Sequence, residues 1–103
     1  MSYNGGPMTE AMYYILLALL NPNHGYQLMQ AVGEVSGGRV KMGPGTLYGV
    51  LTRMQKEKLI IILTDDGRRK TYQITDDGRD ALKQEYERIK AMVSDGAAIN
   101  DID

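Results

Sequence analysis

The chain has 103 residues with no cysteine and one histidine, and 43% of its residues are hydrophobic. This composition predicts one small globular domain and excludes disulfides, thiolate chemistry and cysteine-based zinc sites. The formal net charge is −1, yet residues 37–72 carry eight of the twelve basic residues against three acidic ones. A segregated basic segment of this kind is typical of proteins that bind nucleic acid.

The N-terminal segment predicts neither export nor membrane insertion. Residues 1–7 are expected to form a flexible lead without the positive region of a signal peptide. The longest apolar run, residues 11–20, is too short to span a bilayer. We therefore expect a cytoplasmic protein that makes no contact with a membrane.

Two helices are predicted before residue 40. Thr9 is suited to cap the first helix, whose apolar stripe runs from Met12 to Leu20 and ends at an Asn-Pro-Asn turn. Asn23 is then expected to cap a helix over residues 24–35, with Tyr26, Met29 and Val32 on its inner face. Residues 39–42 are expected to form a short strand or an extended link.

A third helix is predicted within residues 43–60, which lead directly into a strand. Gly43 is a tolerable cap and proline follows it in the first turn. The inner face is apolar and consists of Leu47, Val50, Leu51 and Met54. The outer face is small, hydroxylated or cationic, with Gly45, Gly49, Thr52 and Lys56 at its centre and Thr46, Tyr48 and Arg53 on its flanks. Such a face suits close approach to a polyanion.

A β-hairpin and a long helix are predicted to complete the chain. Strands over residues 59–63 and 70–74 flank a turn with a basic tip, and Tyr72 is expected in the core. Thr75 can cap a helix over residues 76–95. Its apolar stripe is Leu82, Tyr86, Ile89 and Val93, which is longer than a small wing domain can cover. Residues 96–103 are expected to be a frayed tail.

Three helices followed by a two-stranded wing describe a winged helix-turn-helix. The predicted fold class is mainly α with a small β-hairpin, divided into a DNA-binding domain over residues 1–75 and a dimerisation helix over residues 76–95. In this arrangement the third helix enters a major groove of double-stranded DNA and the cations of the wing reach flanking phosphates.

An ordered set of motifs resembles the PadR family of bacterial transcriptional regulators over about residues 11–93. The motifs are His24-Gly25-Tyr26, Gly45-Thr46-Leu47-Tyr48, Leu59-Ile60, Arg68-Arg69-Lys70-Thr71-Tyr72 and Ile74-Thr75-Asp76-Asp77-Gly78-Arg79. The resemblance implies a two-fold homodimer built from the first and last helices. It also implies regulation of neighbouring genes, with release from DNA in some members by planar or lipophilic compounds at the dimer interface.

Two positions depart from the family pattern. Gly49 stands where the family often has proline, and it removes side-chain reach from the outward face of the third helix. Lys58 stands where the family usually has glycine, and it adds a cation near the base of the wing.

The candidate site residues form two groups. The candidate DNA-binding residues are Thr46, Tyr48, Gly49, Thr52, Arg53, Lys56, Arg68, Arg69 and Lys70. For these, a solvated helix face and a merely soluble hairpin tip are the alternatives. The candidates for a dimer interface or effector site are Met8, Met12, Ile15, Leu82, Tyr86, Ile89, Met92 and Val93. A plain dimer seam is favoured over an adaptable effector site, because the chain has no tryptophan on which a flat compound could stack.

No enzymatic activity, cofactor or metal is expected. The one histidine has neither a second histidine nor a cysteine to complete a metal site, and no glycine loop has phosphate-binding spacing. The predicted function is that of a sequence-specific regulator, a repressor, that binds a pseudo-palindromic operator as a homodimer. Release by a lipophilic or phenolic effector at the dimer interface is a secondary hypothesis. The alternative is a winged-helix module that binds protein instead of DNA.

Overall fold

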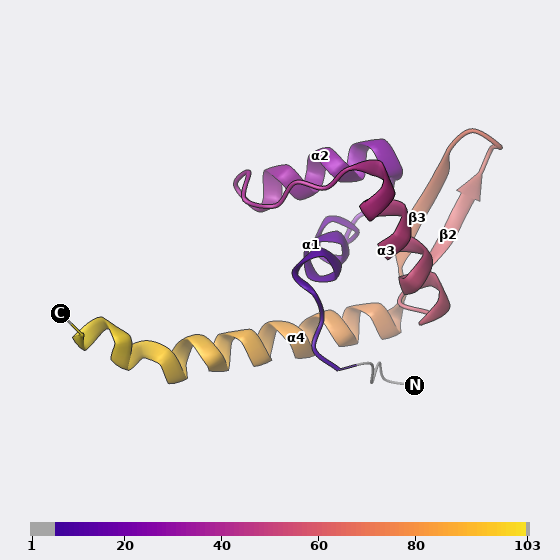
Figure 1. The fold of residues 1–103 in the computed structure, drawn as a ribbon. Coiled ribbons are helices and arrows are strands. Elements are labelled where there is room, and N and C mark those ends of the chain that lie inside the picture. Colours follow the sequence, from indigo (N-terminus) through magenta and orange to yellow (C-terminus); the bar gives the residue numbers. More distant parts are fainter. Residues whose placement is uncertain (1–5, 103) are drawn as a thin grey trace.

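The computed structural model describes residues 6–102, so most of the expected flexible lead and the last residue of the tail lie outside the described residues. The elements in chain order are α1 (Glu10–Ala18), β1 (Asn23–His24), α2 (Gly25–Val35), α3 (Pro44–Lys56), β2 (Ile60–Asp65), β3 (Lys70–Ile74), α4 (Asp76–Asp95) and the 3-10 helix η1 (Gly96–Asp101). Three helices, a wing and a long last helix confirm the predicted fold class, the winged helix-turn-helix (Figure 1).

Helix α1 forms the centre of the core. Thr9 caps it as predicted, because its side-chain oxygen accepts the Met12 N–H at 3.1 Å. The helix packs against α2, α3 and α4, and it lies between α2 and α4 in Figure 1. The fully buried side chains of the three-helix core are Met12, Ile15, Leu16, Leu19, Leu28, Val32, Leu47, Leu51 and Met54. Each such side chain stabilises the fold by roughly 1.5–3 kcal/mol relative to an exposed one.

Helix α2 begins one residue later than the sequence predicts. His24 is the N-cap residue, and the Asn23 side chain accepts the His24 N–H at 2.8 Å, so the prediction that Asn23 caps the helix is wrong. The prediction that Tyr26 belongs to the core is also wrong, since Tyr26 is 66% exposed. The inner face consists of Gly25, Leu28 and Val32. Gly25 and Leu28 thus stand one position before the predicted Tyr26 and Met29, and the two residues before the helix pair with β3.

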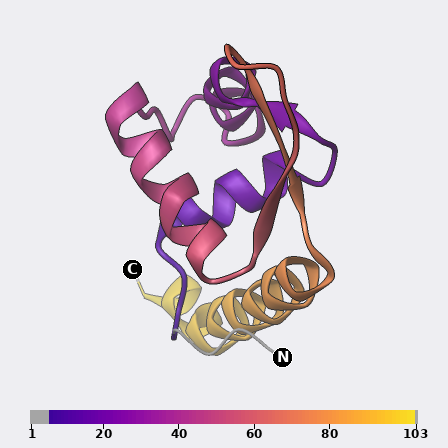
Figure 2. The ribbon, with the colours of Figure 1, turned by 90° about the vertical axis from the view of Figure 1, so that its right-hand side faces the viewer.

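The wing is a three-stranded antiparallel sheet in the order β1-β3-β2, one strand more than the predicted hairpin. Ile60 lies opposite Ile74 and Ile62 lies opposite Tyr72 in the β2–β3 ladder. Tyr72 is buried, as predicted. The β2–β3 ribbon projects from the helices, with its turn farthest from α4 (Figure 2). Residues 39–42 form no strand and link α2 to α3, so the first of the two expected alternatives, a short strand, is wrong.

Lys58 terminates α3 in a left-handed conformation, with φ of 61°. The Leu59 N–H donates to the Met54 carbonyl at 2.9 Å and the Lys58 N–H donates to the Gln55 carbonyl at 3.0 Å. These two bonds are the Schellman motif, in which the left-handed position is usually glycine because a Cβ is disfavoured there. The left-handed backbone is therefore a physical reason for the glycine that the family usually has at this position.

Lys58→Gly is expected to stabilise the free protein by about 1 kcal/mol, because it removes the Cβ from a left-handed position. A gain of this size raises the melting temperature by roughly 4–8 °C in a domain of this length. Thermal unfolding at fixed protein concentration measures it. The matched control Lys56→Gly lies in the helix and is expected to leave the stability unchanged or lower it. A lower melting temperature for Lys58→Gly would contradict the assignment.

Helix α4 is joined closely to the end of α3. The Thr75 side chain accepts the Gly78 N–H at 2.9 Å, which confirms the predicted cap, and donates to the Lys58 carbonyl at 2.8 Å. A Cβ on Gly78 would lie 2.1 Å from the Leu59 carbonyl oxygen, so only glycine allows this approach. The helix then extends beyond the body of the molecule as an arm (Figure 1). It continues into η1, where the sequence had suggested a frayed tail.

The segment before α1 is tied to α4 through Glu85. Glu85 is buried, and its carboxylate accepts the Met8 N–H at 3.2 Å and the Arg88 Nε–H at 2.9 Å. The hydrogen bonds from Arg88, followed by the Met8 amide, hold the pKa of Glu85 below its usual value, although burial opposes this shift. The apolar stripe predicted for this helix does not include Glu85, because a glutamate is normally expected to face solvent.

Acid is expected to destabilise the protein through Glu85. A carboxyl whose pKa is lower in the folded state stabilises the fold above the unfolded pKa of about 4.3, and that contribution is lost as the pH falls through the folded pKa. Glu85→Gln is therefore expected to lower the melting temperature at pH 7 and to make it less dependent on pH below about 5. Melting curves between pH 3 and 7 test this. Parallel pH profiles for the two proteins would contradict it.

Candidate nucleic-acid interface

The outward face of α3 carries two glycines and a threonine before Lys56. A Cβ built on Gly45 or Gly49 would meet no other group within 4 Å, so both glycines face open space. Thr46 and Thr52 are exposed, and the Thr52 hydroxyl donates to the Tyr48 carbonyl at 2.8 Å. A second surface can therefore approach the α3 backbone closely along this face.

The two cations of α3 differ in their surroundings. Arg53 forms an ion pair with Glu57 at 2.9 Å, one turn along the helix. An exposed pair of this kind contributes little to stability, and the carboxylate offsets part of the positive charge of the arginine. Lys56 is exposed and has no ion pair among residues 6–102. Of the two, Lys56 is therefore the cation whose positive charge is not offset by a carboxylate in the described residues.

The turn between β2 and β3 is held by two aspartates. The Asp66 carboxylate accepts the Arg69 N–H at 2.7 Å and the Arg68 N–H at 3.0 Å, and Asp65 accepts the Gly67 N–H at 2.9 Å. The bond from Arg69, and then the one from Arg68, lowers the pKa of Asp66. The backbone of the turn is therefore fixed while the side chains of its two arginines are exposed. In the described part of the chain, neither arginine nor Lys70 has an ion pair.

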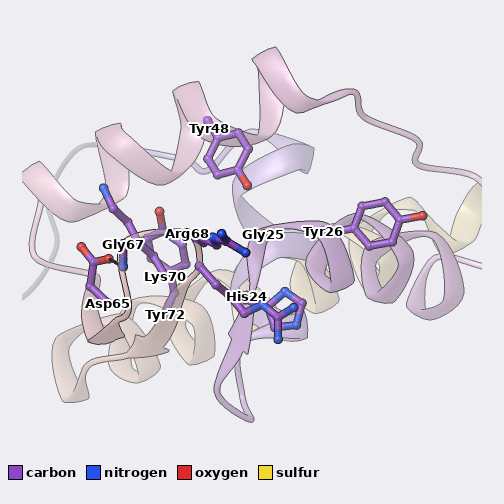
Figure 3. A pocket seen from close by; sticks show the side chains of 10 residues that line it. His24, Gly25, Tyr26, Tyr48, Asp65, Gly67, Arg68, Lys70 and Tyr72 are labelled. Carbon is purple, nitrogen blue, oxygen red and sulfur yellow. Dashed lines mark hydrogen bonds between the residues drawn. The ribbon is translucent and has the colours of Figure 1, made fainter.

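A cleft of about 430 Å³ separates α2, α3 and the wing (Figure 3). Its lining residues are His24, Gly25, Tyr26, Tyr48, Asp65, Gly67, Arg68, Arg69, Lys70 and Tyr72. The structure thus brings four of the predicted DNA-binding residues to one cleft, the three cations of the wing and Tyr48. Thr46, Gly49, Thr52, Arg53 and Lys56 lie on α3 outside its lining.

The floor and rim of the cleft include residues that the sequence did not assign to a site. Tyr72 is buried, and burial, followed by nearby Tyr48 and Asp65, raises its pKa, so the phenol is uncharged at neutral pH. The sequence shows His24 and Gly25 as part of a motif and argues against His24 as a metal ligand, but it assigns neither residue to this cleft. These two residues line the cleft because β1 pairs with β3. No local sequence pattern indicates this pairing.

The predicted interface residues divide into a buried and an exposed set. Met8, Met12, Ile15 and Leu82 are buried in the chain's own core. Tyr86, Met92 and Val93 are 52%, 50% and 70% exposed on α4. Ile89 is partly exposed, so its exposure is intermediate between the two sets. The second half of α4 therefore presents an apolar surface beyond the body.

Two tyrosines of α1 accompany this surface, and the sequence stripe had not included them. Tyr13 and Tyr14 are partly buried, with rings packed edge to face at 5.7 Å. Burial, followed by the proximity of Tyr86, raises the pKa of Tyr13. The Arg39 guanidinium donates to the Tyr14 hydroxyl at 3.1 Å and to Glu10 at 3.0 Å. A tyrosine-rich junction thus joins α1 to α4.

Two other classes of site have no candidate in the described residues. No group of three or more histidine, aspartate or glutamate side chains is placed to hold a metal ion within residues 6–102. Across the same residues, no helix combines the length and apolar character that crossing a membrane requires.

The chain is similar to proteins of known sequence and structure. A relative from Streptomyces fradiae, an uncharacterised 37.1 kDa protein in transposon TN4556, is 34% identical over 97 residues, which are 90% of this chain and 28% of that protein. The chain therefore spans less than a third of the length of that relative. A PadR family regulator from Eggerthella lenta has the same fold, with a TM-score of 0.76 and 21% identity over 89% of this chain and 82% of that one.

A further solved structure is of Bacillus subtilis PadR in complex with operator DNA. It matches with a TM-score of 0.65 and 26% identity, over 76% of this chain and 47% of that one. The model of the transcriptional regulator PadR-like family matches residues 15–84, from the middle of α1 into α4. This match covers more than half of the chain and includes α3 and the whole wing, so the chain belongs to the PadR-like family of transcriptional regulators.

Proposed function

We propose that the protein is a sequence-specific DNA-binding repressor that acts as a homodimer. The observation that carries this proposal is that the wing cations, which have no ion pair within residues 6–102, share a cleft with Tyr48 of α3, a helix whose outer face is open at Gly45 and Gly49. Base readout requires a helix that can enter a groove closely. Phosphate contact requires cations next to that helix. The operator complex of Bacillus subtilis PadR, a structural neighbour of this chain, supports the assignment by analogy.

The second half of α4 supplies the proposed dimer contact. Its exposed apolar residues continue the face that its first half buries against the body, and a partner helix would remove them from water. A two-fold dimer carries two copies of α3, which read half-sites about 34–36 Å apart along the DNA. The proposed operator is therefore pseudo-palindromic.

The tyrosine-rich junction of α1 and α4 is the proposed place for an effector. Met92 and Val93 lie about two turns beyond Tyr86 on the arm, and all three are exposed. The proposed effect of a lipophilic or phenolic compound held there is a change in the spacing of the two α3 helices. The proposed protein acts in the cytoplasm by binding and carries out no catalytic step.

Selection from a random pool of duplex DNA, followed by binding measurements between 50 and 300 mM salt, tests the function. We expect an enriched pseudo-palindrome, and an affinity that falls by roughly 10³–10⁵ between 50 and 200 mM salt if six to ten phosphates are contacted. The alternative, a module that binds protein, predicts no enrichment. Absence of DNA binding at 50 mM salt would refute the regulator.

A further inference from the structure

Tyr48 extends from α3 to the start of α2, where glycine makes room for it. A Cβ built on Gly25 would lie 2.1 Å from the Tyr48 hydroxyl oxygen and 2.8 Å from its Cζ atom. Figure 3 shows the ring directed from α3 toward Gly25, with the hydroxyl leading. Any other residue at position 25 would displace the ring, so the placement of the Tyr48 hydroxyl depends on this glycine.

The Tyr48 side chain is partly exposed where it lines the cleft. Tyr48 is 47% exposed, and its hydroxyl has no hydrogen-bond partner among the described residues. It shares the cleft with three cations, Arg68, Arg69 and Lys70. The one carboxylate in the lining, Asp65, accepts the backbone N–H of Gly67. A hydroxyl donor that faces surplus positive charge is suited to an anion with several acceptor oxygens.

Tyr48 is directed away from the face of α3 that a base pair would meet. The centre of that face is marked by Gly45 and Gly49, whose side of the helix is open. Tyr48 instead leans toward α2, between the helix and the wing. A group in the cleft would therefore lie beside the groove, where the sugar-phosphate backbone runs, and not at its floor.

We propose that the cleft seats one phosphodiester of the DNA backbone in each protomer, with the Tyr48 hydroxyl donating to a phosphate oxygen and Gly25 acting as the positioning residue for that hydroxyl. This inference rests on the proposed DNA-binding function. It assigns Tyr48 to the register of the protein on the duplex and not to the reading of base sequence. The wing cations surround the same phosphate.

Tyr48→Phe is the first test, because phenylalanine keeps the ring and removes only the donor. We expect affinity for the selected duplex to fall about tenfold per protomer, and so up to about a hundredfold for a dimer. The loss should be equal on the selected duplex and on duplexes with single base changes, since a phosphate contact carries no sequence information. Unchanged affinity, or a changed sequence preference, would overturn the proposal.

A methylphosphonate scan of the selected duplex locates the contact. One uncharged linkage per half-site is expected to weaken the unmodified protein and to have a much smaller effect on Tyr48→Phe. If every linkage weakens both proteins equally, the hydroxyl does not contact the backbone.

Gly25→Ala tests the positioning role in two backgrounds. It is expected to lower affinity in the presence of Tyr48 and to add no further loss to Tyr48→Phe, since the hydroxyl that it displaces is then absent. Gly33→Ala is the matched control on the same helix, because a Cβ there meets nothing within 4 Å. Equal losses in both backgrounds, or no loss in either, would remove Gly25 from the site.

The same measurements separate this inference from the function on which it rests. The unmodified protein is measured first, at 50 mM salt. If it does not bind DNA, the proposed function fails. If it binds with the expected salt dependence while Tyr48→Phe binds equally well, the function stands and the phosphate seat is refuted.

Discussion

Replacing Arg68, Arg69 and Lys70 together with alanine is expected to lower DNA affinity at least about a hundredfold near 0.1 M salt. The three cations have no ion pair in the described part of the chain and share one cleft. If each contacts a phosphate in both protomers, six contacts are lost. The slope of log affinity against log salt should then become shallower by about 5. Fluorescence anisotropy over a salt series measures both quantities.

The matched control removes three cations from α4, with Arg79→Ala, Lys83→Ala and Lys90→Ala combined. The change in net charge is the same, but none of these residues lines the cleft. We expect an affinity within a few-fold of the unmodified protein. If the control loses as much affinity as the wing variant, the net charge and not the cleft governs binding. Circular dichroism and the elution volume confirm that both variants remain folded.

Val93→Glu is expected to convert the dimer into a monomer of 11.5 kDa. Val93 is 70% exposed on α4, so the change costs the isolated chain little. In the proposed interface the same change buries an unpaired charge, at a cost of about 3–5 kcal/mol, which raises the dissociation constant of the dimer by roughly 10²–10³ or more. Size exclusion with light scattering at micromolar concentration measures the mass.

Ala91→Glu is the control for this substitution, because two residues correspond to about 200° around a helix and place it on the opposite side of α4. Ala91 is also exposed, and its variant is expected to remain a dimer that binds the full operator. Val93→Glu should retain only weak binding to a half-site. A monomeric unmodified protein, or a dimeric Val93→Glu, would refute the role of this face.

The helices and the wing were predictable because their signals are local. Thr9 and Thr75 each accept the N–H group of the residue three positions later, so each cap depends only on neighbouring residues. The stripe of Leu47, Leu51 and Met54 follows the helical period and is buried in the structure. Such features depend on the chain within one or two turns of each residue.

The errors in α2 come from a distant part of the chain. Asn23 lies opposite Tyr72, 49 residues away, and this pairing makes the two residues before α2 extended. The helix therefore starts at Gly25, and its buried face includes Gly25 while Tyr26 is exposed. A capping pattern cannot predict this later helix start, because the competing hydrogen bonds come from a strand that is distant in the sequence.

The sequence by itself determined the fold class, the basic segment and the family pattern, since composition, period and motif order are properties of the chain alone. Tertiary structure decided which of those residues act together. It enclosed Met12 and Ile15 in the core, and it paired Arg53 with Glu57. It also brought Tyr48 over Gly25 beside the wing. The physical reason is that burial and proximity arise between residues far apart in sequence, so they exist only once helices and sheet have packed.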